Sequence, residues 1–340
     1  MMSAGKQKGM DAIADERGVI RAAAMDQRGS LKRALAKEKN VATNAISDQD
    51  LAEFKTAVIQ ILSPYASGVL LDPDYGLPAA KARHEGVGLL LAYEKSGYDN
   101  TQPGRMPQLM PDWTVDRLKR AGADCIKLLI HYTPLEEPAL NDQKKALVQQ
   151  VGDACVECDV PFFLEFVGYD QGGKLSPLEY ARQKPDIVTQ SMREFSQDQY
   201  HVDILKVEIP VNLQFTAGTR WCEGHEAAYS RDEARELCLK AAAVARRPFI
   251  YLSAGVSSSQ FHEALELAVE AGVHFAGVLC GRATWQEGIP VYAQKGRSAL
   301  EDWLSTHGVP HIQALNEILA GACSWKDFDA EGGALSPDGT

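Results

Sequence analysis

Four charged residues stand inside or at the end of short apolar segments of this chain: Asp26, Lys127, Glu165 and Lys206. A buried ionised group without a partner is costly, so we expect these side chains to be neighbours in the fold. One interpretation is a structural ionic core in which both lysines pair with Asp26, Glu165 and Glu208. The other, which we favour, is that one lysine, crowded by a second cation and partly desolvated, has a lowered pKa and attacks a carbonyl carbon as a free amine.

A second group of residues has the character of an anion site. Residues 253–257 and 281–284 both follow apolar segments, and their small residues let backbone N–H groups approach an anion. Arg282 adds a planar guanidinium that can bind phosphate through two parallel hydrogen bonds, and Ser253 adds a hydroxyl donor. An ordinary loop is the alternative, because a glycine before an arginine also occurs without a ligand. We favour a phosphate site made of Ser253, Gly281 and Arg282.

Metal and cofactor motifs are weak in this sequence. Cys155 and Cys158 form a lone CxxC without a second pair. A zinc-dependent mechanism needs several ligands at strand ends, and His131 is the only histidine expected at such a position. Residues 86–88 lack the third glycine of a dinucleotide-binding fingerprint and lead into a strand. We therefore expect no metal and no cofactor.

The elements that would position these residues alternate along the chain. Eight apolar segments have strand composition: residues 18–25, 68–71, 87–92, 125–130, 161–167, 204–209, 248–252 and 275–280. Helices are expected at 48–63, 112–121, 141–158, 177–199, 230–246, 257–271, 296–306 and 311–321. Five residues are candidate N-caps: Ser47, Asp142, Ser176, Ser230 and Ser257. Eight alternating units favour a single-domain α/β protein, a (β/α)8 TIM barrel, over a doubly wound open sheet.

In a barrel, the charged residues of the strands can be located. Alternate strand residues point inward, and functional groups gather at the carboxyl ends of the strands. On the sixth expected strand, Lys206 and Glu208 share one face, whereas Leu205 and Val207 share the opposite face, which suits packing under helices. We therefore expect Lys206 to point into the barrel.

Composition supports one globular domain and excludes disordered, collagen-like and coiled-coil proteins, because 45% of the 340 residues are apolar and 24% are charged. We expect a helical extension over residues 1–17, the barrel over 18–326 and a flexible acidic tail over 327–340. Forty-six acidic and 35 basic residues give a net charge of −11, which repels nucleic acid and anionic membranes. Any anionic ligand therefore needs a local site.

The seven cysteines, an odd number, and the lack of an apolar segment after Met1 favour a reduced, cytoplasmic location. The apolar segments are far shorter than the roughly 20 residues that cross a bilayer. We expect a small molecule as the partner, with neither nucleic acid nor membrane, and a homo-oligomer stays an open alternative.

Several segments resemble the tagatose 1,6-bisphosphate aldolase family, and the match extends from about residue 9 to residue 326. The motifs that carry it are AMDQRGSLKR (24–33), LLDPDYGLP (70–78), LLLAYEKSGY (89–98), LKVEIPV (205–211), YLSAGV (251–256) and GVLCGRATW (277–285). The resemblance implies a metal-independent class I aldolase on a (β/α)8 barrel. Its reaction would cleave tagatose 1,6-bisphosphate to glycerone phosphate and glyceraldehyde 3-phosphate, in lactose and galactose catabolism.

The resemblance also implies roles for individual residues. Lys206 would form the Schiff base and Glu165 would act as the acid and base, while Lys127 and Asp26 would orient the substrate and tune the charge. The remaining residues would bind the substrate and its phosphate: Gln27, Arg28, Ser253, Gly281 and Arg282.

Two alternatives accompany this assignment. A sister branch with much the same motifs cleaves 6-deoxy-6-sulfofructose 1-phosphate, and Arg28, Lys32 and Arg33 are candidates for contacting the group at the far end of the sugar. The other alternative is a phosphosugar-binding regulator that keeps the barrel and the anion site without turnover. Intact Lys206 and Glu165 argue against the regulator.

Overall fold

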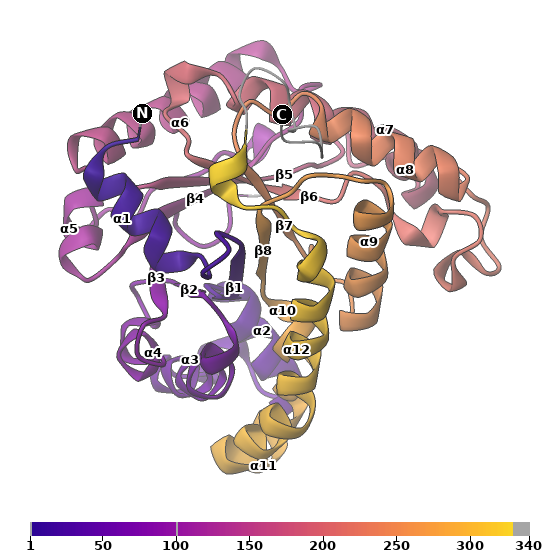
Figure 1. The fold of residues 1–340 in the computed structure, drawn as a ribbon. Coiled ribbons are helices and arrows are strands. Elements are labelled where there is room, and N and C mark those ends of the chain that lie inside the picture. The colour runs from indigo at the N-terminus through magenta and orange to yellow at the C-terminus, as the bar shows by residue number, and fades with distance from the viewer. Residues whose placement is uncertain (1, 100, 329–340) are drawn as a thin grey trace.

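Eight strands form at the eight predicted segments of the chain. Their bounds are β1 (Ile20–Met25), β2 (Gly68–Leu71), β3 (Gly88–Ala92), β4 (Cys125–His131), β5 (Phe162–Val167), β6 (Ile204–Glu208), β7 (Phe249–Leu252) and β8 (Gly277–Cys280). In the computed structural model, which describes residues 2–99 and 101–328, all neighbouring strands are parallel and β1 also pairs with β8. The sheet is therefore a closed barrel, which confirms the predicted (β/α)8 fold over the open sheet (Figure 1).

Helices precede, connect and follow the strands, and most of them surround the barrel on its outside (Figure 1). They are α1 (Ala4–Ile13), α2 (Gly29–Lys39), α3 (Asp48–Leu62), α4 (Leu77–Ala82), α5 (Val115–Arg120), α6 (Pro138–Glu157), α7 (Pro177–Phe195), α8 (Arg231–Ala242), α9 (Ser258–Glu270), α10 (Arg282–Trp285), α11 (Gly288–Trp303) and α12 (Val309–Ile318). Helices α2, α4 and α10 were not among the predicted helices. Helix α11 begins at Gly288, before the predicted start at 296, and Gly296 with φ 79° interrupts its regular geometry. The remaining predicted helices lie within a few residues of their observed positions.

Four of the five predicted N-caps are present. The side chains of Ser47, Ser176, Ser230 and Ser257 each accept a hydrogen bond from a backbone N–H in the first turn. The prediction for Asp142 was wrong. Helix α6 begins at Pro138, whose fixed φ suits the first helical position, so Asp142 lies inside the helix.

The barrel has two apolar layers with different partners. Outward-facing strand residues pack under the helices, as Val69, Leu128 and Val207 do. Inward-facing residues form a separate core inside the barrel: Ile20, Ala22, Ala24, Leu70, Leu90, Ala92, Cys125, Phe163, Ile204, Ile250 and Leu279. Every second residue of a strand faces inward, and several of the inward-facing residues nearest the carboxyl ends of the strands are charged. The barrel is thus apolar at one end and charged at the other.

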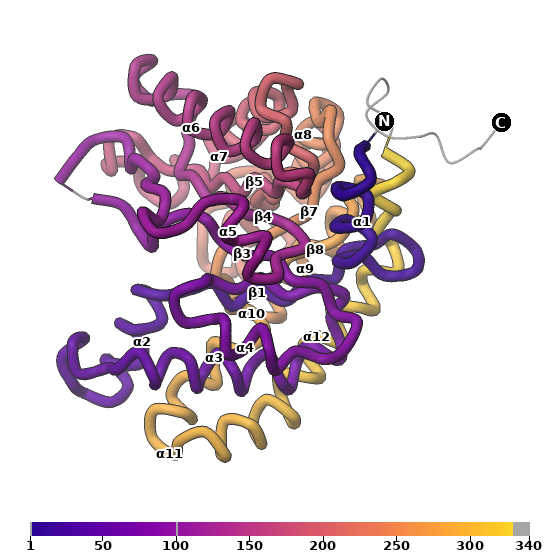
Figure 2. The backbone as a smooth tube through the Cα atoms, turned by 90° about the vertical axis from the view of Figure 1, so that its left-hand side faces the viewer, coloured from indigo at the N-terminus to yellow at the C-terminus, as the bar shows by residue number. Residues whose placement is uncertain are grey.

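Helix α1 closes the apolar end of the barrel. Its Met10 and Ile13 join the inner core, and Ile13 lies against Gly68 and Gly88 at the start of β2 and β3. Trp325 joins the same core, and its backbone N–H donates to Gly18 O. Figure 2 shows the indigo α1 beside the last yellow turns of the described chain. The predicted acidic tail over 327–340 lies almost entirely outside the described residues.

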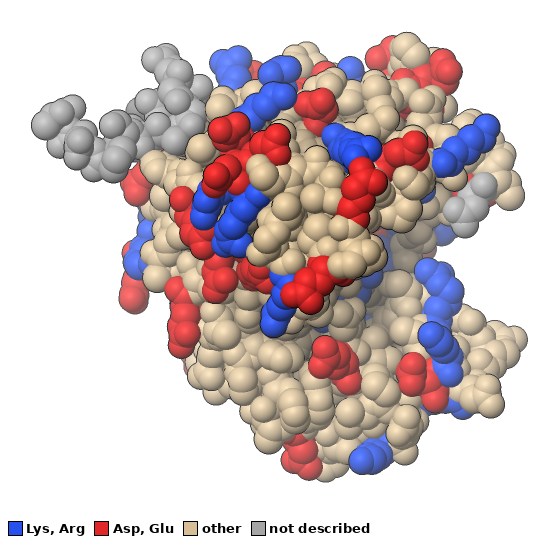
Figure 3. Space-filling view, turned by 90° about the vertical axis from the view of Figure 1, so that its right-hand side faces the viewer, with Lys and Arg blue, Asp and Glu red and all other residues tan. Residues whose placement is uncertain are grey.

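The outer surface carries charges of both signs. Figure 3 shows Lys and Arg side chains interspersed with Asp and Glu on the face that it draws. Pairs between α8 and α9 are an example, since Arg231 and Arg235 both reach Glu270. Over residues 2–99 and 101–328, no helix is both long and apolar enough to cross a membrane.

Candidate active site

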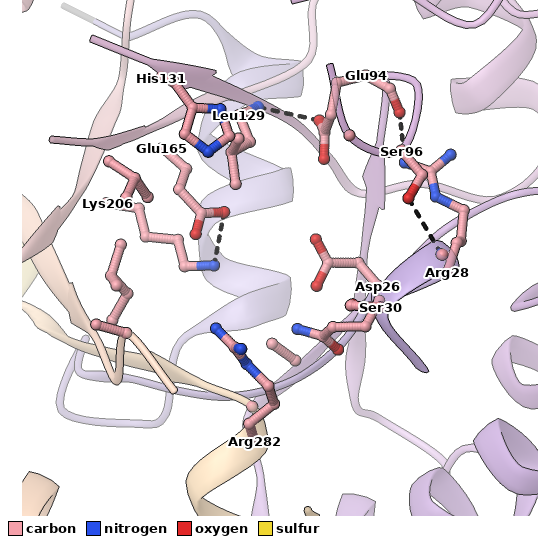
Figure 4. Close-up of a pocket in the computed structure, with 18 of the residues that line it drawn as sticks. Asp26, Arg28, Ser30, Glu94, Ser96, Leu129, His131, Glu165, Lys206 and Arg282 are labelled. Carbon is pink, nitrogen blue, oxygen red and sulfur yellow. Dashed lines mark hydrogen bonds and ion pairs between the residues drawn. The ribbon is translucent and has the colours of Figure 1, made fainter. Parts of the chain in front are cut away.

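A cavity of about 540 Å³ opens at the carboxyl ends of the strands. Of the nine predicted site residues, eight line it: Asp26, Gln27, Arg28, Glu165, Lys206, Ser253, Gly281 and Arg282. Lys127 is the exception, because it lies one layer deeper and is fully buried. Figure 4 shows Lys206, Glu165, Asp26 and Arg282 turned toward the same space from different sides of the barrel.

Lys206 and Glu165 are partners on neighbouring strands. The register of β5 and β6 places them opposite each other, and Lys206 Nζ donates to Glu165 Oε2 at 2.8 Å. Both side chains are buried at the cavity wall. Burial alone would raise the pKa of Glu165, but the positive charges of Lys127 and Lys206 outweigh it and lower that pKa. Glu165 is therefore an anion beside the Lys206 amine.

Lys127 sits beneath the cavity at the centre of three carboxylates. Its Nζ lies 2.8 Å from Asp26 Oδ2, 2.7 Å from Glu94 Oε1 and 2.9 Å from Glu165 Oε2. Burial opposes the charged form of this lysine, yet the surrounding carboxylates raise its pKa well above the ordinary value. Lys127 is thus a fixed cation, and the charged residues predicted to be neighbours are brought together.

Asp26 faces this cation from the end of β1. Burial would raise its pKa, but Lys127 and Lys206 lower it below the ordinary value. Glu208, which the ionic-core interpretation joined to the same cluster, is elsewhere: its Oε1 lies 3.3 Å from Lys184 Nζ and its Oε2 accepts from Gly168 N. The cluster is therefore built without Glu208.

Glu94 belongs to the cluster but was missed in the sequence. It lies two residues beyond Ala92, the last residue of β3, so the period-two pattern of that strand continues to it. Its Oε2 accepts from Leu129 N at 3.0 Å, in addition to the pair with Lys127. Burial raises the pKa of Glu94, although Lys127 and Arg28 oppose the shift. Its position just outside an apolar segment was the available signal.

The predicted anion site forms a separate wall of the cavity. Gly281 is the last residue before α10, and Arg282 is the first residue of that helix. Gly255 has φ +79°, and a Cβ built there would lie 2.6 Å from Arg282 Cζ, so the guanidinium rests against a glycine. Among the residues drawn in Figure 4, Arg282 has no hydrogen-bond or ion-pair partner. A charged guanidinium facing the cavity from this position suits an anionic ligand.

The cations considered for the far end of the sugar differ in position. Arg28 is buried and already bonded, because its guanidinium donates to Asp74 Oδ2 at 3.1 Å and to the carbonyl of Glu94. Arg33 lines the cavity, whereas Lys32 is not among the lining residues and pairs with Asp48 at 3.6 Å. Lys95 and Arg105, which were not predicted, also line the cavity.

His131 ends β4 at the cavity wall beside Tyr98, with ring centroids 4.7 Å apart. Burial, together with the charge of Arg105, lowers the pKa of His131 to about 4, so the imidazole is neutral at neutral pH. Within the part of the chain that the structure describes, no three His, Cys, Asp or Glu side chains gather as a metal site.

Similar proteins are known. Residues 20–287 match the family described as DeoC/LacD family aldolase. Tagatose 1,6-diphosphate aldolase 2 of Enterococcus faecalis (strain ATCC 700802 / V583) is 48% identical over 326 residues, which cover 95% of this chain and 96% of that protein. Tagatose 1,6-diphosphate aldolase of Listeria monocytogenes serotype 4b (strain F2365) is 45% identical over 323 residues, or 94% of each chain.

Solved structures share the fold at low sequence identity. Fructose-bisphosphate aldolase from Plasmodium falciparum has a TM-score of 0.67 at 11% identity, covering 94% of this chain and 96% of that one. A Schiff-base-forming fructose 1,6-bisphosphate aldolase has a TM-score of 0.53 at 16% identity, covering 91% and 98%. These two structures support the barrel fold.

Proposed function

Because the chain belongs to the DeoC/LacD aldolase family, we propose that it is a class I aldolase that cleaves D-tagatose 1,6-bisphosphate to glycerone phosphate and D-glyceraldehyde 3-phosphate. One observation carries the proposal: Lys206 Nζ reaches the cavity wall 2.8 Å from Glu165 Oε2, and Arg282 faces the same cavity. An amine, an adjacent proton acceptor and an anion-binding cation are the groups that Schiff-base cleavage of a ketose phosphate requires.

The first stage forms a covalent imine. The Lys206 proton passes to Glu165 along their hydrogen bond, and the free amine attacks the C2 ketone of the sugar. Glu165 carries two protons in turn from the Lys206 nitrogen to the former carbonyl oxygen, which then leaves as water and gives an iminium. Lys127 stays charged throughout, because the carboxylates around it raise its pKa.

The second stage breaks the C3–C4 bond. Glu165, which is again a carboxylate, accepts the C4 hydroxyl proton, and the C3–C4 bonding electrons move to the iminium nitrogen, which releases glyceraldehyde 3-phosphate and leaves an enamine. Protonation at C3 and hydrolysis then free glycerone phosphate and restore the Lys206 amine. Asp26 and Lys127 preorganise charge around the C3 and C4 hydroxyls, so little rearrangement is needed when charge develops.

The substrate is oriented by its phosphate. Ser253, Gly281 and Arg282 would hold the phosphate next to the ketone, while Gln27 and Arg28 would contact the sugar from the end of β1. A grip on the phosphate places the ketone carbon near Lys206 in the productive orientation. No step of this mechanism calls for a metal.

We also propose a reducing, cytoplasmic location. All seven cysteines are free, and Cys125, Cys155 and Cys280 are among those that are buried. Free cysteines and a phosphorylated metabolite as the substrate both fit that compartment.

A product assay over four ketoses tests the function. The substrates are tagatose 1,6-bisphosphate, its C4 epimer fructose 1,6-bisphosphate, 6-deoxy-6-sulfofructose 1-phosphate, and tagatose 6-phosphate, which lacks the C1 phosphate. In excess chelator, we expect equimolar triose phosphates from tagatose 1,6-bisphosphate and a much lower kcat/KM for tagatose 6-phosphate. No cleavage of any of the four, or activity that chelator abolishes and zinc restores, contradicts the proposal.

A further inference from the structure

Lys55 is a fully buried lysine on the outer helix α3, away from the cavity itself. Its neighbours on the buried face of the helix are apolar, as Leu51 and Ile59 are, so an apolar residue would pack there without burying a charge. The lysine instead reaches the end of β1. Its Nζ donates to Met25 O at 2.7 Å and to Gln27 O at 2.8 Å.

These two carbonyls lie on either side of Asp26. Strand β1 ends at Met25, where its pairing with β2 also ends, and α2 begins at Gly29. Residues 26–28 therefore connect a strand to a helix, and their three side chains all line the cavity. The Lys55 ammonium binds the carbonyls of Met25 and Gln27, the residues before and after Asp26. These two hydrogen bonds restrict rotation of the backbone at Asp26.

Asp72 completes the arrangement from the end of β2. Its Oδ2 lies 2.6 Å from Lys55 Nζ, and both side chains are fully buried. Its Oδ1 accepts from Tyr75 N at 2.8 Å, and its carbonyl accepts from Gly76 N at 3.0 Å, so the turn after β2 holds the carboxylate in place. Asp74 in that same turn pairs with Arg28. One buried ion pair thus links the ends of β1 and β2 to α3.

We propose that Lys55 and Asp72 are positioning residues for the cleavage reaction, which clamp the peptide carbonyls on both sides of Asp26 and hold its carboxylate against Lys127. This inference rests on the proposed function. Lys55 acts through the backbone of residues 25–27, and neither it nor Asp72 is among the residues that line the cavity. The positive charge of Lys55 also favours the ionised form of Asp26.

A charge-balanced double variant tests the proposal. Lys55→Met/Asp72→Asn keeps similar side-chain volumes and removes both charges, so no unpaired ion stays buried, whereas Lys55→Met alone would leave Asp72 uncompensated. The matched control is Lys6→Met/Asp203→Asn. That pair is nearly buried, with side-chain exposures of 10% and 11% and with Nζ and Oδ2 2.7 Å apart, but Lys6 belongs to α1 at the opposite end of the barrel.

The measurements are kcat and KM with tagatose 1,6-bisphosphate, and the melting temperature. Displacing Asp26 affects the chemical step, so we expect kcat of the Lys55/Asp72 variant to fall by about 10- to 100-fold, with a smaller change in KM because Arg282 still grips the phosphate. The control variant should lose melting temperature to a similar degree and keep kcat.

These measurements distinguish a failure of the positioning role from a failure of the proposed function. A folded Lys55/Asp72 variant with the wild-type kcat overturns the positioning role, as does a control variant that loses kcat equally. If the wild-type protein itself cleaves no ketose and forms no adduct with glycerone phosphate, the proposed function fails and this inference falls with it. An active wild type with an equally active Lys55/Asp72 variant refutes the inference alone.

Discussion

Glu165 Oε2 lies between two lysines, 2.8 Å from Lys206 Nζ and 2.9 Å from Lys127 Nζ. The two cations differ in access, because Lys206 lines the cavity and Lys127 does not. Glu165 can accept the Lys206 proton while Lys127, whose pKa its carboxylate neighbours raise, stays charged. One carboxylate oxygen thus serves the reacting amine and the fixed cation together.

Glu165→Gln should remove the proton acceptor of Lys206 while keeping the shape of the side chain. Loss of a positioned acid and base lowers rates by about 100- to 10,000-fold, and we expect a fall in kcat within that range. Steady-state kinetics with saturating substrate measures it. Glu208→Gln is the matched control, because Glu208 also lines the cavity but pairs with Lys184. Equal losses in the two variants would speak against a special role for Glu165.

Arg282→Ala should weaken binding of glycerone phosphate by about 1.5–3 kcal/mol, the range for a hydrogen bond to a charged group. Arg282→Lys keeps the charge but loses the planar fork, so it should recover part of the affinity. Calorimetric titration of folded protein measures both. An unchanged affinity in Arg282→Ala would place the phosphate elsewhere in the cavity.

Gly255→Ala should reproduce much of that loss without changing any charge. The added Cβ would lie 2.6 Å from Arg282 Cζ and push the guanidinium away from its place at the cavity wall. Gly272→Ala is the control for backbone strain, because Gly272 has a similar φ of +76° but no atom within 4 Å of the added Cβ. We expect both variants to lose stability and only Gly255→Ala to lose phosphate affinity. Full affinity in Gly255→Ala would show that Arg282 can move aside freely.

The lowered pKa of His131 should make the stability of the folded protein depend on pH. Burial lowers its pKa in the folded protein to about 4 from an ordinary value of 6.5, so the unfolded chain binds more protons between these values. Stability from this group is present above pH 6.5 and is lost as the pH falls toward 4. In urea unfolding at about pH 7 and about pH 5, His131→Gln should show a smaller loss of stability on acidification than the wild type. An equal loss of stability in the two proteins would show that other groups cause the pH dependence.

Much of the fold could be predicted from local sequence patterns. The apolar segments predicted the strands because inward and outward residues are both buried in a parallel barrel, and the same alternation brought Lys127, Glu165 and Lys206 to one interior. Glu94 was not predicted as a site residue because it lies beyond the end of its apolar segment. A pattern of period two has to be continued past the strand to find such a residue.

Features that depend on distant pairing were not visible in the sequence. Arg28 was singled out by its motif as a substrate contact, but nothing in the sequence shows that its guanidinium also donates to Asp74, which lies 46 residues away. Lys55 was not among the candidate residues, and only the packing of α3 behind β1 shows which carbonyls it reaches. Single residues cannot reveal such partners, because the register and the helix packing decide them.

Borohydride trapping tests the central claim most directly. Reduction in the presence of glycerone phosphate converts an iminium into a stable amine, and mass spectrometry of the digested protein locates it. We predict one adduct, on the peptide that contains Lys206, and no adduct in a folded Lys206→Met variant. An adduct on Lys127, or labelling that persists in Lys206→Met, would contradict the assignment of Lys206 as the reacting amine.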